Sequence, residues 1–193
     1  MRVCVFAGSS AGARPEYRAA ARALGGALAA RGWGLVYGGG SVGLMGVLAD
    51  ATLAAGGEAV GIIPRALAAR EIAHQHLTEL RVVETMHERK AQMADLADAF
   101  VALPGGAGTF DELFEIITWA QLGLHAKPIG LVNAADYFAP LLALVAHATA
   151  EGFIRPEDRE LLLVRDQADA LLDALAAFTP RPRPSKWLTS EQI

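Results

Sequence analysis

Apolar residues along the chain fall into short continuous runs that alternate with longer segments of helical periodicity. A short apolar run bounded by turn residues predicts a buried strand, whereas apolar residues spaced three and four apart predict a helix. On this basis strands are expected at residues 3–7, 35–37, 59–63, 80–84, 100–103, 128–132 and 161–164. The patterns between them predict helices at residues 15–31, 42–55, 86–98, 137–151 and 168–178. A further helix is expected after the glycines at 105 and 106 and should end at about residue 122.

This alternation of strands and helices indicates the fold class. The predicted strands are apolar throughout rather than at every second residue, as expected when both faces of a sheet are covered. The sequence therefore predicts an α/β fold with a doubly wound, mainly parallel sheet and helices on both faces. One domain is expected over residues 1–178. Residues 64–78 have weak periodicity and predict an irregular connection or short helical pieces.

The chain ends in a proline-rich tail, residues 179–193. Its alternating prolines cannot continue the preceding helix, because proline lacks the N–H group and clashes with the turn before it. The tail is therefore either disordered or an arm that lies on a neighbouring surface. Trp187 and Leu188 favour the arm.

Composition narrows the range of functions. The chain has 193 residues, a net charge of −4 and no cluster of lysine and arginine, which argues against a nucleic-acid-binding face. The single cysteine, Cys4, excludes an intrachain disulfide and lies in an apolar run where we expect it to be buried. The N-terminal apolar run is too short for a signal peptide, and no apolar stretch reaches the roughly 18 residues that span a bilayer. We therefore expect a cytoplasmic protein that binds no membrane.

Three glycine-rich segments follow predicted strands, at residues 8–12, 38–46 and 105–108. Each leads into a helix, whose N-terminal amides and dipole favour an anion. A single such segment is as well explained by a tight turn, but three that converge on the carboxyl edge of a sheet favour phosphate binding. None continues as the Gly-Lys-Ser/Thr of a P-loop. The second has a G-x-G-x-x-G spacing, but the next strand ends in Ile-Ile-Pro instead of an acidic residue, which disfavours NAD.

The most informative segment is Pro-Gly-Gly-Ala-Gly-Thr-Phe-Asp-Glu, residues 104–112. Its glycines form a phosphate-sized nest of amides before a helix. Thr109 either caps that helix or gives its hydroxyl to a phosphate. We expect Glu112 in the first helical turn, where the dipole keeps its carboxylate ionised. The alternative is purely structural, because Thr-x-x-Glu is also a capping box.

A second candidate segment is Met-His-Glu-Arg-Lys, residues 86–90, at the start of a predicted helix. Cations there oppose the helix dipole, so Arg89 and Lys90 call for an anionic partner, either a ligand or a protein carboxylate. Solvated surface charge is the alternative. His74 and His76 form a His-x-His without a recognisable third ligand, so no metal site is expected.

These two segments, together with Gly-Gly-Gly-Ser-Val-Gly-Leu-Met-Gly at residues 38–46, resemble the Lonely Guy family of cytokinin riboside 5′-monophosphate phosphoribohydrolases. The resemblance extends to about residue 153 and implies a Rossmann-like fold, a homodimer, and release of a free base and ribose 5-phosphate from a nucleoside 5′-monophosphate. It also implies that Arg89 and Glu112 are the catalytic pair. By the same resemblance, the substrate-binding residues are Gly39, Gly40, Ser41, Glu71, Lys90, Gly105, Gly106, Ala107, Gly108, Thr109 and Thr118.

The implied chemistry suits these residues. Glycosidic cleavage passes through an oxocarbenium-like state, which an anion such as Glu112 stabilises. No cofactor is expected. Members of the family are also labelled putative lysine decarboxylases, but pyridoxal phosphate needs a Schiff-base lysine, and Lys90, Lys127 and Lys186 are poorly suited to that role. Two alternatives stay open, a broader nucleosidase that accepts AMP and a non-catalytic nucleotide-binding protein. The presence of both Arg89 and Glu112 favours catalysis over simple nucleotide binding, because binding does not require this pair.

Overall fold

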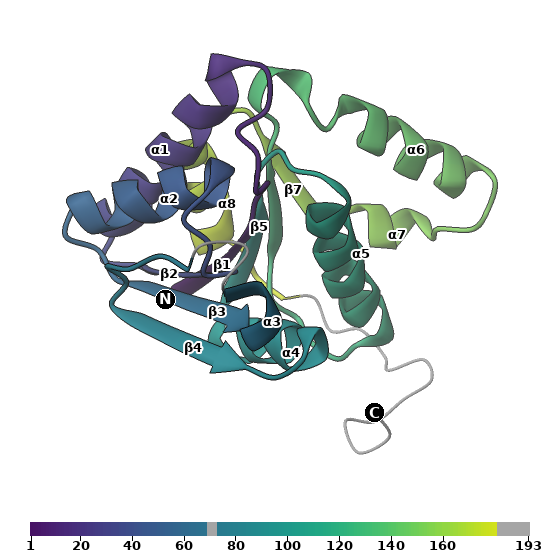
Figure 1. Ribbon diagram of the computed structural model, residues 1–193. Helices are drawn as coiled ribbons and strands as arrows, with labels where there is room; N and C mark the ends of the chain where they lie inside the picture. Colours follow the sequence, from purple (N-terminus) through teal and green to yellow (C-terminus); the bar gives the residue numbers. More distant parts are fainter. Residues whose placement is uncertain (69–72, 181–193) are drawn as a thin grey trace.

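The computed structural model describes residues 1–68 and 73–180 (Figure 1). Within these ranges, seven strands form one sheet in the order β4-β3-β2-β1-β5-β6-β7. Every pairing between neighbouring strands is parallel. The strands are β1 (Arg2–Phe6), β2 (Gly34–Tyr37), β3 (Ala59–Pro64), β4 (Glu79–Val83), β5 (Ala99–Ala102), β6 (Ile129–Val132) and β7 (Leu162–Arg165). The predicted α/β class and parallel sheet are therefore confirmed.

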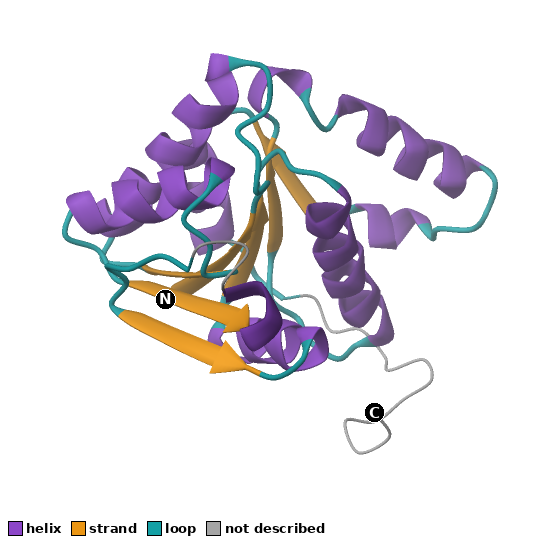
Figure 2. Cartoon of the chain, in the orientation of Figure 1, coloured by secondary structure: helices purple, strands orange, loops and turns teal. Residues whose placement is uncertain are grey.

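The helices lie on both sides of the sheet (Figure 2). They are α1 (Pro15–Ala30), α2 (Gly43–Ala54), α3 (Arg65–Ala68), α4 (Met86–Leu96), α5 (Ala107–Leu122), α6 (Ala139–Ala150), α7 (Pro156–Arg159) and α8 (Ala168–Ala176), with a 3-10 turn, η1 (Ala134–Asp136), before α6. Most predicted bounds differ from these by one or two residues. Helix α7 was not predicted, because four residues are too few to show periodicity. None of the described helices is long and apolar enough to cross a membrane.

The order of the strands identifies the edge of the sheet at which folds of this kind bind ligands. The chain starts in the middle with β1, adds β2, β3 and β4 on one side, and then returns to place β5 on the other side of β1. In doubly wound sheets, ligands bind where the direction of winding reverses, outside the carboxyl ends of the strands. Here that place lies between the ends of β1 and β5, at the top of Figure 1.

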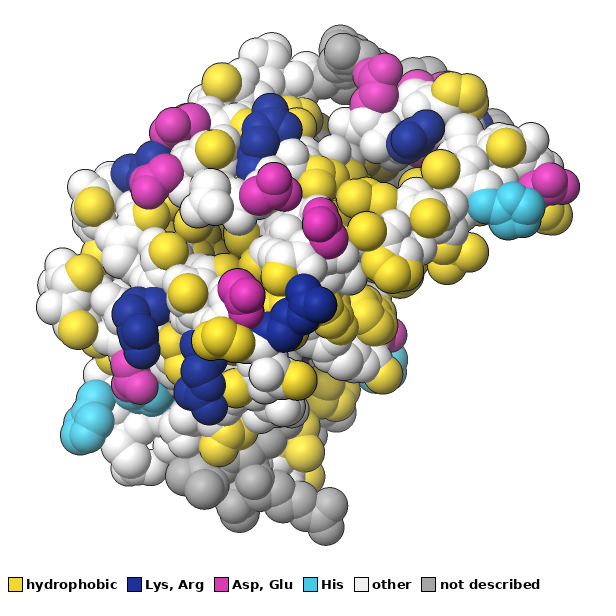
Figure 3. Space-filling view, turned by 90° about the horizontal axis from the view of Figure 1, so that it is seen from above, with side chains coloured by type: hydrophobic (Ala, Val, Ile, Leu, Met, Phe, Trp, Pro, Cys, Tyr) yellow, Lys and Arg dark blue, Asp and Glu magenta, His cyan; other side chains and the backbone are white. Residues whose placement is uncertain are grey.

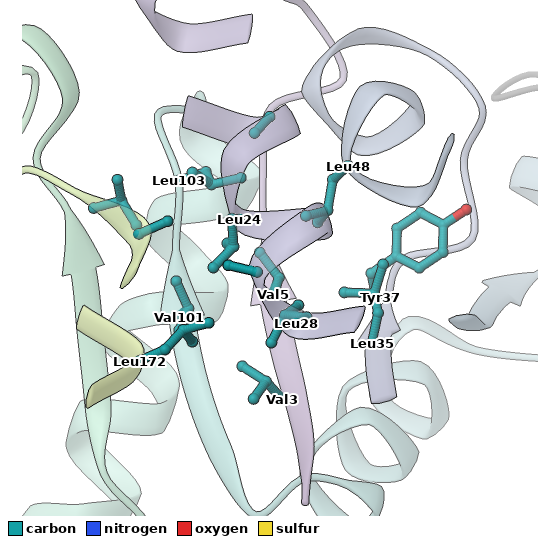
Figure 4. Packing of buried hydrophobic residues seen from close by; sticks show 14 of the residues in the cluster. Val3, Val5, Leu24, Leu28, Leu35, Tyr37, Leu48, Val101, Leu103 and Leu172 are labelled. Atoms are coloured by element: carbon teal, nitrogen blue, oxygen red, sulfur yellow. The ribbon is translucent and has the colours of Figure 1, made fainter. Parts of the chain in front are cut away.

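Each face of the sheet has its own apolar core. Beneath α1, α2 and α8, the fully buried side chains include Leu24, Leu28, Leu48 and Leu172 (Figure 4). The opposite core lies under α4 and α5 and contains Cys4, as expected, with an exposed fraction of 0%. Burial of apolar side chains on both faces explains why the central strands are apolar along nearly all of their length, with Arg2 at the exposed start of β1 as the charged exception.

Edge strand β4 departs from this pattern. Leu80 and Val82 are 38% and 47% exposed, and Glu79 and Arg81 form an ion pair on the same strand. The prediction of strands apolar throughout is wrong for β4, because an edge strand has a neighbour on one side alone and less helix above it.

Candidate functional site

The turn after β1 and the turn after β5 contact each other through their backbones. Gly8 N donates to Pro104 O at 3.1 Å, and Gly8 O accepts from Leu44 N of α2 at 2.9 Å. A Cβ added at Gly43 would lie 2.3 Å from the backbone of Ser9. The three glycine-rich turns therefore lie together at the carboxyl edge of the sheet, and backbone contacts this close require glycine.

The nest that follows β5 is packed at its base and open above. Helix α5 begins at Ala107, and its N-cap is Gly106 in an extended conformation. A Cβ on Gly105 would lie 2.0 Å from Thr109 Oγ1 and 2.9 Å from Gly8 N. A Cβ on Gly106 or Gly108 would meet no described atom within 4 Å. Residues 106–108 are also exposed, so the start of α5, where a helix can bind an anion, is open to solvent.

The start of α5 corrects two expectations about this segment. Thr109 is the third residue of the helix, is 4% exposed and does not cap it. Glu112 lies in the second helical turn rather than the first. The capping-box explanation for residues 109–112 is therefore wrong, because Gly106 holds the cap position.

A capping arrangement of that kind stands instead at the start of α4. Thr85 is the N-cap, and its Oγ1 accepts from Glu88 N at 3.1 Å. Glu88 Oε2 in turn accepts from Glu84 N at 2.9 Å. This Thr-x-x-Glu pattern is visible in the sequence but was not predicted as a cap. It fixes the first turn of the helix that carries Arg89 and Lys90.

Arg89 is 6% exposed, and its guanidinium is inserted between the carboxyl ends of β2 and β3. Its Nε donates to Ile62 O at 3.1 Å and its Nη2 to Gly38 O at 3.0 Å. The remaining nitrogen, Nη1, lies 3.8 Å from Met86 Sδ. Two backbone carbonyl oxygens therefore offset part of the cost of burying the charge of Arg89.

Lys90 contacts two protein carboxylates, one of the two kinds of anionic partner expected for a cation at the start of this helix. Its Nζ donates to Glu115 Oε1 at 2.9 Å and to Asp111 Oδ2 at 3.3 Å. Burial alone would lower the pKa of Lys90, but the hydrogen bonds and charges of Glu115 and Asp111 outweigh it and raise that pKa above its usual value. Lys90 therefore stays charged and ties α4 to α5. Neither Glu115 nor Asp111 was among the predicted site residues.

Glu112 and Arg89 both lie close to the same buried group. Burial raises the pKa of the Cys4 thiol well above its usual value, the charge of Glu112 raises it further, and the charge of Arg89 lowers it. Glu112, Glu115 and Lys90 also line a cavity of about 10 Å³ between α4 and α5. That volume is about what one water molecule needs. Arg89 of α4 and Glu112 of α5 therefore both act electrostatically on Cys4, which lies in the middle of β1.

The turn after β2 is partly occupied by a later segment of the chain. Gly40 forms an antiparallel bridge with Ala73, and Gly39 O accepts from His74 N at 3.0 Å. His74 is 6% exposed; its Nε2 lies 3.0 Å from Asp50 Oδ1, and its Nδ1 accepts from the backbone amide at position 76. Both ring nitrogens of this histidine are engaged within the protein.

Several other residues singled out in the sequence lie outside the described part of the chain, and Ser41 lies in a turn. Glu71 lies outside the described residues, as do Lys186, Trp187 and Leu188 of the tail. Ser41 stands in the turn after β2, where its carbonyl approaches Gly46 so closely that a Cβ there would lie 2.0 Å from it.

Thr118 is not near the nest in the described chain. It is exposed, lies eleven residues after Ala107 on α5, and donates from Oγ1 to Phe114 O at 2.7 Å. Eleven residues of helix correspond to about 16 Å. Phe114 on the same side is 39% exposed, whereas Trp119 packs against the core.

The chain is similar in sequence to a protein family and to several named proteins. The model of a family described as possible lysine decarboxylase matches residues 45–175. A probable cytokinin riboside 5′-monophosphate phosphoribohydrolase of Oryza sativa subsp. japonica is 52% identical over 93% of this chain and 79% of its own length. A cytokinin riboside 5′-monophosphate phosphoribohydrolase of Arabidopsis thaliana is 48% identical over 93% of this chain and 84% of its own length.

Solved structures show the same fold at lower identity. The molybdenum cofactor carrier protein of Chlamydomonas reinhardtii has a TM-score of 0.68 and 22% identity, over 92% of this chain and 98% of that one. A molybdenum cofactor binding protein of Rippkaea orientalis has a TM-score of 0.67 and 21% identity, over 91% and 95%. Identities this low bear on the fold alone. The family match and the plant relatives go further, and by them the chain belongs to the Lonely Guy family.

Proposed function

We propose that this protein hydrolyses the N-glycosidic bond of an N6-modified adenosine 5′-monophosphate and releases the free base and ribose 5-phosphate. The observation that carries the proposal is the open amide nest at Gly106 and Gly108, one helical turn before Glu112. Four residues of helix span about 6 Å, which suits a ribose held by its 5′-phosphate at one end and attacked at the other. The plant relatives, named for this reaction, support it.

Each part of the site has a chemical task in this proposal. The amides at the start of α5 hold the phosphate, aided by the helix dipole. The carboxylate of Glu112 stabilises the positive charge that develops on the ribose as the base departs. Arg89 is anchored through Nε and Nη2, so its Nη1 is the nitrogen that would meet the base or orient Glu112. Lys90, paired with Asp111 and Glu115, holds α4 against α5 beside Glu112.

The proposal is tested by incubating the protein with AMP and, separately, with N6-isopentenyl-AMP and measuring free base. Release from the modified nucleotide at the higher kcat/KM is the expected result. Equal or faster release from AMP would replace it by the broader nucleosidase. Tight binding of either nucleotide without release of base would leave a non-catalytic binding protein.

Exchange of Glu112 for glutamine tests the catalytic carboxylate. Glu112→Gln should lower kcat about 100-fold or more, because it removes a charge aimed at the transition state while leaving the nest intact. The dissociation constant for ribose 5-phosphate should change little. Glu58→Gln, at the opposite edge of the sheet, is the matched control and should keep wild-type kcat. Unchanged kcat in Glu112→Gln would remove this residue from the mechanism.

We further propose that the protein is not a pyridoxal-phosphate decarboxylase, although its family model carries that description. A Schiff-base lysine must present a neutral amine. Lys90 is held charged by two carboxylates, and Lys127 Nζ donates to Ala94 O at 2.9 Å. Incubation of the protein with lysine and pyridoxal phosphate should therefore yield no cadaverine.

A homodimer is also part of the proposal. In Figure 3, which looks down on the carboxyl edge, hydrophobic side chains gather where α6 projects from the body of the molecule. Leu144 on α6 and Phe153 just after it are 60% and 87% exposed. Thr118, placed in the site by the resemblance, is too far along α5 to reach the nest of its own chain. A second copy packed on α5 and α6 would cover the apolar surface and bring Thr118 to a neighbouring site.

Light scattering of the purified chain should accordingly give twice the monomer mass. Leu144→Asp combined with Phe153→Asp should give a monomer, because a charge buried in an apolar interface is strongly disfavoured. A monomeric wild-type chain at micromolar concentration would contradict the dimer without bearing on the nest.

A further inference from the structure

The turn between β6 and α6 has a conformation that its own side chains hold in place. Ala135 and Asp136 both have positive φ, at 50° and 59°, which is uncommon for residues other than glycine. Asn133 is 8% exposed; its Oδ1 accepts from Phe138 N at 2.8 Å and its Nδ2 donates to Asp136 Oδ1 at 3.2 Å. The result is that Tyr137 is held at one fixed place beside the start of α5.

Tyr137 joins this turn to the phosphate nest. Its hydroxyl donates to the carbonyl oxygen of Gly105, 32 residues earlier in the chain. Its ring lies edge-on against Tyr17, with centroids 5.5 Å apart, and parallel to Phe110, with centroids 6.5 Å apart. Three elements around the nest, α1, α5 and the turn before α6, thus fix the position of one hydroxyl group.

The peptide unit between Gly105 and Gly106 transmits this contact to the nest. A trans peptide is planar, so its N–H points in the opposite direction from its C=O. With the Gly105 carbonyl held toward Tyr137, the Gly106 N–H points away from Tyr137, and Gly106 is where the space above α5 is open. A glycine pair without such a hydrogen bond has many accessible conformations, because glycine lacks the steric limits of a Cβ.

We propose that Tyr137 is a positioning residue, which orients the Gly105–Gly106 peptide so that its amide binds the 5′-phosphate of the substrate. The inference rests on the proposed function for the identity of the ligand. Tyr137 itself does not touch the reacting atoms. Its contribution is to phosphate affinity, and it applies equally to bound substrate and transition state, so it should change KM and leave kcat nearly unaltered.

The test compares Tyr137→Phe with Tyr17→Phe. Both replacements remove one hydroxyl from the same aromatic group and keep the ring, but Tyr137 alone of the two bonds to Gly105. Calorimetry with ribose 5-phosphate should show affinity reduced roughly fivefold in Tyr137→Phe, the value of one net hydrogen bond, and unchanged in Tyr17→Phe. With the nucleotide substrate, KM should rise by a similar factor while kcat stays within about twofold.

A ligand without phosphate separates positioning from general loosening of the structure. The inhibition constant of adenosine should be the same in Tyr137→Phe and wild type, since adenosine has no group for the nest. Equal losses for adenosine and ribose 5-phosphate, or equal effects of the two tyrosine variants, would overturn the proposal. Binding of ribose 5-phosphate is measured without turnover, so a wild-type chain that releases no base would refute the proposed function and still leave the role of Tyr137 decided.

Discussion

Two glycine-rich turns look alike in the sequence and differ in the structure. In the turn after β2 and the start of α2, the glycines are crowded by protein: a Cβ at Gly38 would lie 1.8 Å from Arg89 Nη2, and one at Gly46 would lie 2.0 Å from Ser41 O. In the turn after β5, Gly105 is crowded but Gly106 and Gly108 meet no described atom within 4 Å. The first turn needs glycine for packing, and the second has glycines that leave space for a ligand.

This difference shows that the number of glycines in a turn does not identify a binding site. What matters is which atoms would occupy the place of the missing Cβ. Where those atoms belong to the protein, substitution should cost stability; where the space is open, substitution should cost affinity for a ligand and leave the fold intact. Single glycine-to-alanine exchanges in each turn therefore test whether the two turns differ in this way.

The largest effect is expected for Gly38→Ala. The added methyl displaces the Arg89 guanidinium and weakens its buried hydrogen bonds to the carbonyls of residues 38 and 62. Overpacking and the loss of hydrogen bonds to a charged group together should lower the free energy of unfolding by about 3 kcal/mol. Chemical denaturation measures this value, and a loss below about 1 kcal/mol would show that the crowding relaxes easily.

A smaller effect, of a different kind, is expected for Gly106→Ala. Gly106 has φ −101° and ψ −155°, a conformation open to alanine, so the free energy of unfolding should stay within about 0.5 kcal/mol. The methyl would enter the space assigned to phosphate and should weaken binding of ribose 5-phosphate about tenfold. If the free energy of unfolding fell while the affinity for ribose 5-phosphate stayed unchanged, the open space at Gly106 would have no role in binding.

The smallest effect is expected for Gly108→Ala, in the first turn of α5. Alanine is favoured over glycine in a helix by up to about 1 kcal/mol, so the variant should be slightly more stable than wild type and bind phosphate less well. Gly26→Ala in α1 is the matched control, because a Cβ there also meets no described atom within 4 Å. The Gly26→Ala variant should gain stability without losing affinity for ribose 5-phosphate. Thermal unfolding of both variants, with and without ribose 5-phosphate, measures the two effects.

The hydrophobic pattern predicted most of the fold, because strands buried on both faces and helices with an apolar side leave strong periodic signals. Element ends were less accurate, since they depend on hydrogen bonds rather than burial. Of the two alternatives expected for the segment after β3, a short helical piece is present as α3. Its bridge to Gly40 was not predicted, because it joins residues 33 positions apart through backbone atoms alone.

The site was less predictable than the fold. Thr109 and Thr85 both begin a Thr-x-x-Glu pattern, and only the place where each helix starts decides which one caps. The contacts of Lys90 with Glu115 could have been suspected, since Glu115 follows Glu112 by three residues on one side of a helix. Tyr137 gave no local signal, because its partner is a carbonyl oxygen in another turn.

The way in which Arg89 is held has a consequence for reading related sequences. Its two shortest contacts are with the carbonyl oxygens of Ile62 and Gly38, groups that any amino acid at those positions would supply. Substitution at position 62 therefore leaves this anchor in place, and the arginine and residue 62 have no reason to change together. A search for co-varying residue pairs would miss the contact, although it fixes a residue of the proposed catalytic pair.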